Sequence, residues 1–583
     1  MQELPFPLNH YLRAITEAYG SVASSTFGYY IEGSNTPITL PEAQQALLDK
    51  IAQLISEQPA RGRVLLYGDQ LGNLAYKLSE FSLITLLSPS GQYAAFPDQE
   101  VKVSESQLET VSGELADFNS SVRYDWIIIP RTINYSDLLF LTQVSLNLLT
   151  PRGCLLWVGE LLKDNSTYRY SALPFTDTFE NLAERLGFEL FHKEEMTHEV
   201  LPGVIEIQRL LLSNKEQCAG SSTDDLIRAE NSIAQLKESF ASGQSGCFLY
   251  VLSKAHEVRT ATQSLMYLSS GSFPPAEYAH IFQSSFNQPF NEKVWRWKYQ
   301  SGKGIGLIAT VAGSLVGHYG GVPRQIEFFG EPALALQICD VMVLPEQRRK
   351  YGKDSLFFKL AATFLEREIG NSVVHLLGFG FPNLKAMRMA TRLGLYEKTD
   401  DFVEIHYPSD TSLKVAENPI IIKLDPDNSQ HTQTVDRLWA SMRNALTDSV
   451  IGLRDFNYIS YRYLEHPIGD YHCLLVQPFD ESDPVALVVV KEFEGALLLM
   501  DIVADPVHFP RAIEMIIIHC AEQFPHQILR CRITGGWHEL VMIEGATLNH
   551  IGIEIPCHSW TKGPSASTLR GKWWLTAGDM DFI

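Results

Sequence analysis

Asp340-Val-Met-Val-Leu-Pro-Glu-Gln-Arg-Arg-Lys-Tyr-Gly-Lys-Asp-Ser355 is the stretch that decides the fold of the middle of the chain. Its first residues predict a buried strand, the basic and Gly-containing residues predict a turn, and residues 356–368 predict a helix. Arg349-x-x-Gly352 brings backbone N–H groups and positive charge to a helix N-terminus, where the dipole favours a phosphate. The turn therefore predicts a pyrophosphate site. A turn without a ligand is the alternative, because Arg and Gly are common at such junctions.

The composition limits the class of protein. At 583 residues the chain is too long for one core and predicts about three or four domains of roughly 150 residues each. The net charge of −21 repels polyanions, so nucleic acid is not an expected partner. No apolar run approaches the roughly 18 residues that a membrane span requires, and residues 1–5 lack the basic start of a signal peptide. We expect a cytoplasmic protein without a membrane partner.

The first 255 residues alternate short apolar strands with helical sequence. The expected strands include residues 64–67, 83–87, 126–129 and 154–158. Alternation of this kind predicts a mainly parallel sheet with helices on both faces.

Three segments of this unit resemble class I S-adenosylmethionine methyltransferases and occur in that family's order. They are Tyr124-Asp-Trp-Ile-Ile-Ile129, Leu149-Thr-Pro-Arg-Gly-Cys-Leu-Leu-Trp157 and Phe179-Glu-Asn-Leu-Ala-Glu-Arg-Leu-Gly-Phe188. The resemblance implies a Rossmann-like, methyltransferase-type domain over residues 1–255, with residues 246–252 as a final antiparallel strand. It also implies S-adenosylmethionine as a cofactor.

The same unit departs from that family where the cofactor would lie. The turn after the first strand keeps Gly68 and Gly72, but it has Gln70 in place of the middle glycine and Leu66 where an acid is usual. Residues 83–89 offer no carboxylate to the ribose hydroxyls, which forfeits a charge-assisted bond worth about 1.5 to 3 kcal/mol. A structural or partner-binding domain is one interpretation, and a methyl donor site with unusual contacts is the other.

After a linker expected at residues 256–272, a second unit is expected at residues 273–412. Its order of elements is a helix, two strands, the quoted segment and its helix, a further strand, and a helix that contains an Asn. This order resembles the GNAT family of acyl-CoA-dependent N-acyltransferases. The motifs that carry the resemblance are Val343-x-Pro345, Arg349-x-x-Gly352, and Asn383-x-x-Ala386 followed by Leu393-Gly394.

The resemblance implies that an acyl-CoA, such as acetyl-CoA, lies with its pyrophosphate on the turn and its pantetheine along splayed strands. The amine of a small molecule would attack the thioester, with one protein group as base and another as acid. The residues implied to bind the cofactor are Val343, Arg348, Arg349, Gly352, Lys353, Ser355 and Asn383. Two positions depart from the family, since its usual Tyr acid is Ala390 here and the last small residue of the turn is Asp354.

Three residues are candidates for catalysis. Asp340, at the start of the central strand, is a candidate base, and His375, expected on the next strand, titrates in the useful range. Tyr319 is a candidate for the missing acid, with Tyr396 as its alternative. Each candidate also has a structural interpretation, because a strand Asp often bonds backbone or Arg and a lone strand His is often a core residue.

Residues 413–583 repeat the pattern of the second unit, as a degenerate GNAT-like domain. The corresponding segments are Tyr461-Arg-Tyr463 with Trp297-Lys-Tyr299, and Leu499-Met-Asp-Ile-Val-Ala-Asp-Pro506 with Ile338-Cys-Asp-Val-Met-Val-Leu-Pro345. The turn Val507-His-Phe-Pro-Arg511 has no glycine, and its proline removes an N–H donor, so no phosphate site is expected there. Because Asp501 persists in this copy, its counterpart Asp340 has a structural interpretation in both.

The terminal residues 571–583 are aromatic and acidic, which indicates a strand packed between the two copies or a substrate rim. The whole chain is therefore expected to be α/β, with a Rossmann-like domain followed by two GNAT-like domains. The expected function is acyl-CoA-dependent N-acyl transfer to an unidentified amine. The alternatives are a non-catalytic scaffold or binding protein, and an S-adenosylmethionine-dependent methyltransferase.

Overall fold

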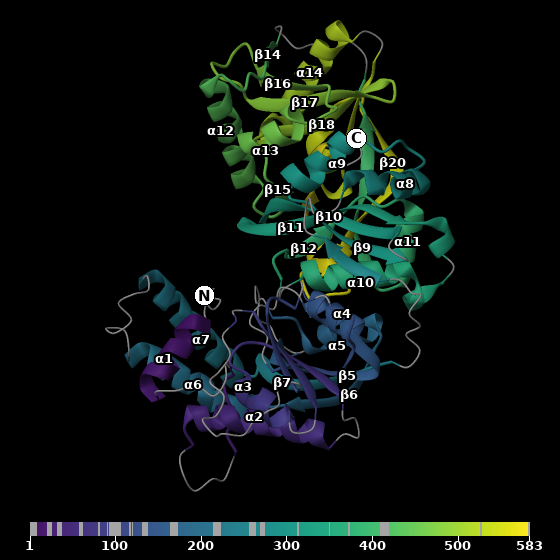
Figure 1. Ribbon diagram of the computed structural model, residues 1–583. Helices are drawn as coiled ribbons and strands as arrows, with labels where there is room; N and C mark the ends of the chain where they lie inside the picture. The colour runs from purple at the N-terminus through teal and green to yellow at the C-terminus, as the bar shows by residue number, and fades with distance from the viewer. Residues whose placement is uncertain are drawn as a thin grey trace. The chain divides into compact units, whose positions relative to one another are not determined.

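The computed structural model describes most of the chain, in two compact units, Met1–Thr262 and Gln263–Ile583 (Figure 1). The described residues are 8–19, 26–31, 38–57, 62–79, 82–89, 91, 107–115, 118, 120–130, 138–163, 173–213, 223–255, 264–268, 274–311, 314–348, 350–370, 373–408, 419–524 and 527–580. Within these ranges, no helix has the length and apolar character needed to cross a membrane.

The first unit is built on a seven-stranded sheet in the order β3-β2-β1-β4-β5-β7-β6. Strands β1 to β5 pair in parallel, whereas β7 runs antiparallel to both β5 and β6. This confirms the expected mainly parallel sheet with a final antiparallel strand. The strands are β1 (Arg63–Tyr67), β2 (Leu83–Ser88), β3 (Leu108–Ser112), β4 (Tyr124–Ile129), β5 (Leu149–Leu162), β6 (Phe188–Glu195) and β7 (Ser245–Lys254).

Helices cover both faces of this sheet (Figure 1). Successive residues of a strand face opposite sides, and the neighbours Leu65 and Leu66 of β1 belong to two separate buried clusters. The Leu66 cluster includes residues of α1, α2, α3, α6 and α7, and the Leu65 cluster includes residues of α4 and α5. These helices are α1 (Leu8–Tyr19), α2 (Leu40–Ser56), α3 (Gly72–Ser79), α4 (Leu138–Leu148), α5 (Thr176–Leu186), α6 (Thr197–Ser213) and α7 (Thr223–Ala241).

The first half of the second unit, residues 264–408, has a sheet in which β8 to β11 are antiparallel and β12 is parallel to β11. Strand β8 lies inside the expected linker 256–272, so part of that segment is a strand at the edge of a sheet. The elements are β8 (Ser264–Leu268), α8 (Pro275–Phe286), α9 (Glu292–Arg296), a π-helix (Trp297–Ser301), β9 (Ile305–Val311), β10 (Ser314–Phe328), β11 (Glu331–Val343), α10 (Leu356–Glu368), β12 (Leu377–Phe379), α11 (Leu384–Arg392) and β13 (Tyr396–His406).

The second half, residues 419–580, follows a similar order of elements as far as β19, with β15 inserted between α12 and α13. Strands β14, β16, β17 and β18 are antiparallel, and β19 is parallel to β18. The elements are β14 (Ile420–Lys423), α12 (Ser429–Ala445), β15 (Val450–Gly452), α13 (Phe456–Ile459), a π-helix (Ser460–Leu464), β16 (Tyr471–Gln477), β17 (Ala486–Phe493), β18 (Ala496–Ala504), α14 (Phe509–Gln523), β19 (Leu529–Thr534), β20 (Thr547–His558), α15 (Ala566–Leu569) and β21 (Trp573–Trp574).

The two halves exchange strands. Strand β13 of the first half pairs with both β19 and β20 of the second half. In return, β15 pairs with β10 of the first half and with β21. Strand edges offer unpaired backbone groups, and each half supplies partners for the other. The domain boundaries expected at residues 273–412 and 413–583 stay predictions. In the structure, each half contributes a strand to the sheet of the other.

Candidate functional site

The basic turn between β11 and α10 is exposed. Residues 350–354 are all exposed, and Tyr351 is 87% exposed. Gly352 has a φ of +65°, a left-handed conformation that favours glycine, and an added Cβ would meet no atom within 4 Å. Glycine is therefore required here by the backbone and not by crowding. The space beside it is open.

The N-terminus of α10 meets this turn. Ser355 caps the helix, since its Oγ accepts from the Phe358 N–H at 3.2 Å and donates to the Gly352 carbonyl at 2.7 Å. The amides of Leu356 and Phe357 have no acceptor within a helix at these positions. With the exposed Lys353 they give this end of the helix a positive potential suited to an anion.

Strands β11 and β12 diverge beside the turn. They pair only over residues 335–337 and 377–379, and among the described residues no strand pairs with residues 338–343 on that side. Arg348 folds back onto β11, where its Nε donates to the Val343 carbonyl at 2.8 Å. Arg349 lies outside the described residues. The divergence has the form of the splayed strands that the family resemblance implies.

Asn383 is the N-cap of α11. Its Oδ1 accepts from the Ala386 N–H at 2.9 Å, so the Asn-x-x-Ala spacing is that of a cap and the third residue of a helix. The side chain named as a cofactor ligand therefore has a structural partner in the helix that it begins.

Between β18 and α14, where every residue is described, the second half has no such turn. In the first half, residues 348–355 separate the 3₁₀ turn Pro345–Gln347 from α10, whereas α14 begins directly after the 3₁₀ turn Pro506–His508. Arg511, at the start of α14, pairs at the surface with Asp480 and Glu481. The absence of a phosphate site from the second half stays a prediction.

Asp340 is buried in an ion pair. Its carboxylate accepts from the Lys298 ammonium at 2.9 and 3.0 Å and from the Tyr299 hydroxyl at 3.0 Å. It sits in a bulge of β11, where its φ is +50°, and its carbonyl accepts from His318 Nδ1 at 2.6 Å. Burial by itself raises the pKa of the Asp340 carboxyl, but the charge and hydrogen bonds of Lys298 hold that pKa below its ordinary value. Asp340 is thus a paired carboxylate.

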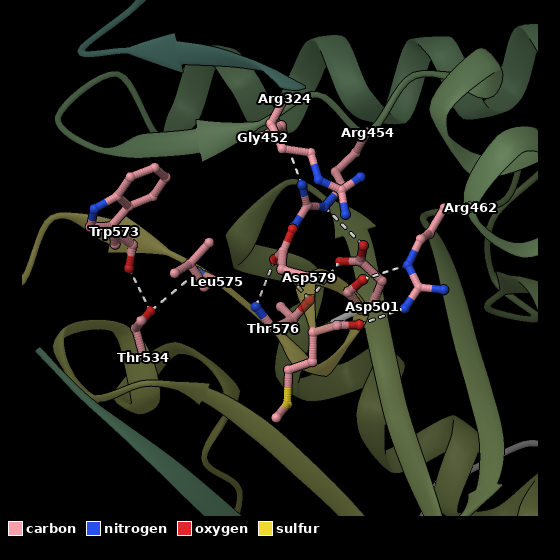
Figure 2. A network of polar contacts seen from close by, with 12 residues as sticks. Arg324, Gly452, Arg454, Arg462, Asp501, Thr534, Trp573, Leu575, Thr576 and Asp579 are labelled. Carbon is pink, nitrogen blue, oxygen red and sulfur yellow. Dashed lines mark hydrogen bonds and ion pairs between the residues drawn. The ribbon is translucent and has the colours of Figure 1, made fainter. Parts of the chain in front are cut away.

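Asp501 occupies the corresponding place in the second half. The Tyr463 hydroxyl donates to its carboxylate at 3.0 Å, as Tyr299 does to Asp340. Its cationic partner is Arg454, which precedes the π-helix, whereas Lys298 lies within one. Arg454 Nε lies 2.8 Å from Asp501 Oδ2 (Figure 2). The tyrosine–aspartate pair is common to both halves, which favours a structural interpretation of Asp340.

Tyr319 and Asp340 lie on opposite faces of the sheet. Tyr319 follows His318 on β10, and successive strand residues face opposite sides. His318 packs against Trp295 at 5.4 Å between ring centres, on the side of the Asp340 carboxylate, whereas Tyr319 packs against Phe364 of α10 at 5.1 Å. The structure does not bring the candidate acid and the candidate base together.

Tyr319 has a different neighbour, Tyr396 of β13. Their hydroxyl oxygens are 2.5 Å apart, and both side chains are buried. Burial raises the pKa of each above its ordinary value, so both phenols stay protonated at neutral pH. The two residues named as alternative acids form one hydrogen-bonded pair that joins β10 to β13, the strand that pairs with the second half.

His375 lies far from Asp340. It precedes β12, and its Nδ1 lies 3.0 Å from the Glu368 carbonyl. Ala335 pairs with Leu377, so Asp340, five residues after Ala335, and His375, two residues before Leu377, are offset by seven residues. At about 3.3 Å per residue this offset is about 23 Å. Burial lowers the pKa of His375, which therefore stays neutral.

In the described part of the first unit, the turn after β1 and the end of β2 bond to each other. The turn after β1 contains the buried Asp69, whose carboxylate accepts from the Ser88 hydroxyl at the end of β2. Ser88 stands where the ribose-binding acid is expected, and it bonds to the turn itself. Gln70 has a φ of +60° in the position of the middle glycine. An internal hydrogen bond thus takes the place of the expected ribose contact.

A family model matches the segment that contains the turn. Residues 275–384 match the acetyltransferase (GNAT) domain, and this segment contains α8, the turn, α10 and the start of α11. We call residues 275–384 the GNAT domain after this match. The match confirms the family resemblance of the middle of the chain and supports acyl transfer as its general chemistry.

Solved structures resemble each unit more distantly. A GCN5-related N-acetyltransferase from Kribbella flavida is 14% identical, covers 51% of this chain and 70% of its own, and has a TM-score of 0.38. An N-acyltransferase candidate from Enterococcus faecalis is 13% identical over 51% of this chain and 72% of its own, with a TM-score of 0.40. A sarcosine dimethylglycine methyltransferase candidate from Galdieria sulphuraria is 13% identical over 42% of this chain and 99% of its own, with a TM-score of 0.35. No curated protein sequence matches the chain. All three scores are below 0.5, so each fold is assigned from its own strand order.

The sequence did not point to Lys298 as the partner of Asp340. The signal that could have found it was the correspondence of Trp297-Lys-Tyr299 with Tyr461-Arg-Tyr463, which places one basic residue inside each π-helix. Both basic side chains are buried, Lys298 at 6% and Arg462 at 1% exposure. A buried cation requires a partner, and in the first half that partner is the aspartate of the tyrosine–aspartate contact that both halves share.

Proposed function

We propose that the GNAT domain binds an acyl-CoA, acetyl-CoA first of all, and transfers its acyl group to the amine of a small molecule. The observation that carries this proposal is the exposed turn with Gly352 in a left-handed conformation, set at the N-terminus of α10 beside the diverging strands β11 and β12. Acyl-CoA supplies a thioester, whose acyl carbon forms a bond to the amine nitrogen as its bond to sulfur breaks.

In this proposal the turn binds the pyrophosphate. Arg348, Arg349 and Lys353 contribute charge, and the amides around Gly352 and Ser355 contribute donors. The unpaired edge of β11 up to Val343 would hold the pantetheine amides. Asn383 acts by starting α11 and not as a direct ligand, because its side chain caps that helix.

For catalysis, the proposal favours Tyr319 over Asp340 and His375. A proton donor to the leaving thiolate must be protonated, and the raised pKa of Tyr319 meets that requirement. The Asp340 carboxylate is paired with Lys298, and His375 is offset from Asp340 by about 23 Å along the sheet. If Tyr319 is the acid, Tyr319→Phe lowers kcat and leaves KM for acetyl-CoA unchanged.

A non-catalytic binding protein is the second candidate function. The observation that favours it is the separation of the three candidate catalytic residues, which lie on two faces and at two ends of the sheet. We propose the same for the first unit, as a structural or partner-binding domain, because Ser88 and Asp69 bond to each other in the expected cofactor site.

Two measurements separate these functions. Calorimetric titration of the full chain with acetyl-CoA and with S-adenosylmethionine tests binding. Release of free CoA thiol from acetyl-CoA in the presence of a panel of amines tests transfer. Acetyl-CoA binding with amine-dependent thiol release supports the transferase, and binding without release for any amine supports the binding protein. Binding of neither cofactor at millimolar concentration contradicts the proposal for the GNAT domain.

A further inference from the structure

Residues 573–580, here called the tail segment, are buried along their whole length. They lie in the second half, where β18 and β19 pair over residues 497–499 and 529–531 and then diverge. The strand expected between the two halves within residues 571–583 is Trp573–Trp574, since Trp573 lies 4.8 Å from Phe379 of β12 and Trp574 lies 5.3 Å from Phe509 of α14 between ring centres. Residues 581–583 lie outside the described residues.

The tail segment extends the sheet at β19. Thr576 forms an antiparallel bridge with Ile533, and the Thr534 N–H donates to the Leu575 carbonyl at 3.1 Å. The Thr534 hydroxyl donates to the Trp573 carbonyl at 2.5 Å, and the Leu575 N–H donates to that hydroxyl at 3.2 Å (Figure 2). These are main-chain contacts of the kind by which proteins hold an added peptide strand.

On the other side, two buried arginines hold the tail segment. Arg462 donates to the carbonyls of Gly578 and Met580 at 2.8 and 2.9 Å. Arg454 lies between two carboxylates, 2.8 Å from Asp501 and 2.6 Å from Asp579 of the tail segment (Figure 2). Arg454, Arg462 and Asp501 belong to the second half, which without Asp579 would bury two cations and one carboxylate. The tail segment completes the charge balance that such a buried site requires.

The tail segment also fits closely against β18 at Gly578. A Cβ on Gly578 would lie 2.0 Å from the Tyr463 hydroxyl and 2.8 Å from the Met500 carbonyl, both closer than real Cβ contacts. Only glycine lets the backbone approach β18 so closely. The position is therefore specific for the residue that occupies it.

We infer that the second half of the second unit is a binding module for a peptide segment that pairs with β19 and then forms a 3₁₀ turn with one buried carboxylate, and that its ligand is the chain's own tail segment. The cleft between β18 and β19 corresponds to the cleft between β11 and β12, and each adjoins a tyrosine–aspartate pair. The tail segment therefore takes, in the second half, the place proposed for acyl-CoA in the first. The inference holds whether or not the first half binds acyl-CoA.

The tail segment also reaches the first cleft. The Gln337 side chain donates from Nε2 to the Asp579 carbonyl at 2.5 Å and accepts from Arg324 Nε at 2.8 Å. Gln337 is the last residue of β11 that pairs with β12. The module thus fixes the tail segment against the point where the two strands of the GNAT domain diverge.

The test separates the ligand from its module. A protease site is inserted between Pro564 and Ser565, in the connection between β20 and α15, and the full chain is then cleaved. We expect the fragment 565–583 to stay bound during size-exclusion chromatography and to exchange with an excess of labelled synthetic peptide of the same sequence. A peptide with Gly578→Ala should compete at least about tenfold less well, and a matched peptide with the exposed Ser567→Ala should compete as well as the natural one.

Two outcomes overturn the inference. One is dissociation of the fragment while circular dichroism shows the remainder folded. The other is equal competition by the natural and Gly578→Ala peptides. If release of the fragment unfolds the remainder, hydrogen exchange on the intact chain decides. The inference requires the amides of Leu575 and Thr534 to exchange as slowly as those of β18, and exchange within seconds contradicts it.

Discussion

The Lys298 ammonium lies 2.9 Å from the Asp340 carboxylate, and both side chains are less than one-tenth exposed. This ion pair, with the Tyr299 hydroxyl, lies at the bulge where β11 pairs with β10, three residues beyond the last pairing of β11 with β12 at Gln337. Asp340, the candidate base, thus stabilises β11 beside the point where β11 and β12 diverge. Its role in the account is to position β11.

Removing one partner of this ion pair should lower the free energy of unfolding. Lys298→Met leaves the Asp340 carboxylate buried without a cation, and we expect a loss of about 3 to 5 kcal/mol in the free energy of unfolding. The double variant Lys298→Met, Asp340→Asn should recover part of that loss. Denaturant unfolding measures both, with the exposed Lys293→Met as control. A loss below about 1 kcal/mol for the single variant would show that the pair does not hold the fold.

His558 should make stability depend on pH. Its Nδ1 accepts from the Gly378 N–H at 3.3 Å, and burial lowers its pKa to about 4. The unfolded chain, with an ordinary His pKa near 6.5, binds the proton first, so stability is full above about pH 6.5 and falls as pH drops toward about 4. The shift corresponds to about 3 kcal/mol.

His558→Asn should therefore reduce the slope of unfolding free energy between pH 4 and 6.5 by about one proton. The exposed His550→Asn, on the same strand, is the control and should leave the slope unchanged. An unchanged slope in the His558 variant would mean that this histidine is already charged in the folded protein.

The hydrogen bond between Ser88 and Asp69 predicts the behaviour of the first unit. Ser88→Ala leaves a buried carboxylate with one donor fewer, and we expect a loss of about 1 to 3 kcal/mol in unfolding free energy. The exposed Ser112→Ala should change it by less than about 0.5 kcal/mol. Thermal unfolding with and without S-adenosylmethionine completes the test. A rise in Tm with millimolar S-adenosylmethionine would contradict the proposed structural role.

The fold was predictable where a local pattern determines it. The apolar strands of the first unit gave its parallel sheet, and the order strand, basic turn, helix gave the GNAT domain. The exchange of β13, β15 and β21 between the halves was not predictable, because alternation along a strand sets its faces and not its partner. Of the candidate site, the turn before α10 is present as expected, and its role in binding a phosphate stays a prediction. Asn383 and Ser355 proved to be helix caps, and a sequence alone does not show that two candidates such as Asp340 and Tyr319 face opposite ways.

Basic residues of the turn before α10 should contribute to acyl-CoA affinity, whereas the basic residue at the start of α14 should not. Arg348→Ala and Lys353→Ala each remove one charge from the α10 turn, and we expect each to weaken acetyl-CoA binding by about tenfold or more, the value of a lost charge-assisted contact. Arg511→Ala, at the start of α14, is the matched control and should leave the Kd unchanged. Equal effects of the three variants would mean that net charge, and not this turn, governs binding.

The central claim is that the chain has one acyl-CoA site, in the GNAT domain, and that the corresponding cleft of the second half is filled by the tail segment. Calorimetric titration of the full chain with acetyl-CoA tests it most directly. The account predicts one site per chain, weakened by Arg348→Ala and unchanged by Arg511→Ala. Two sites per chain, or no binding at millimolar acetyl-CoA, would contradict it.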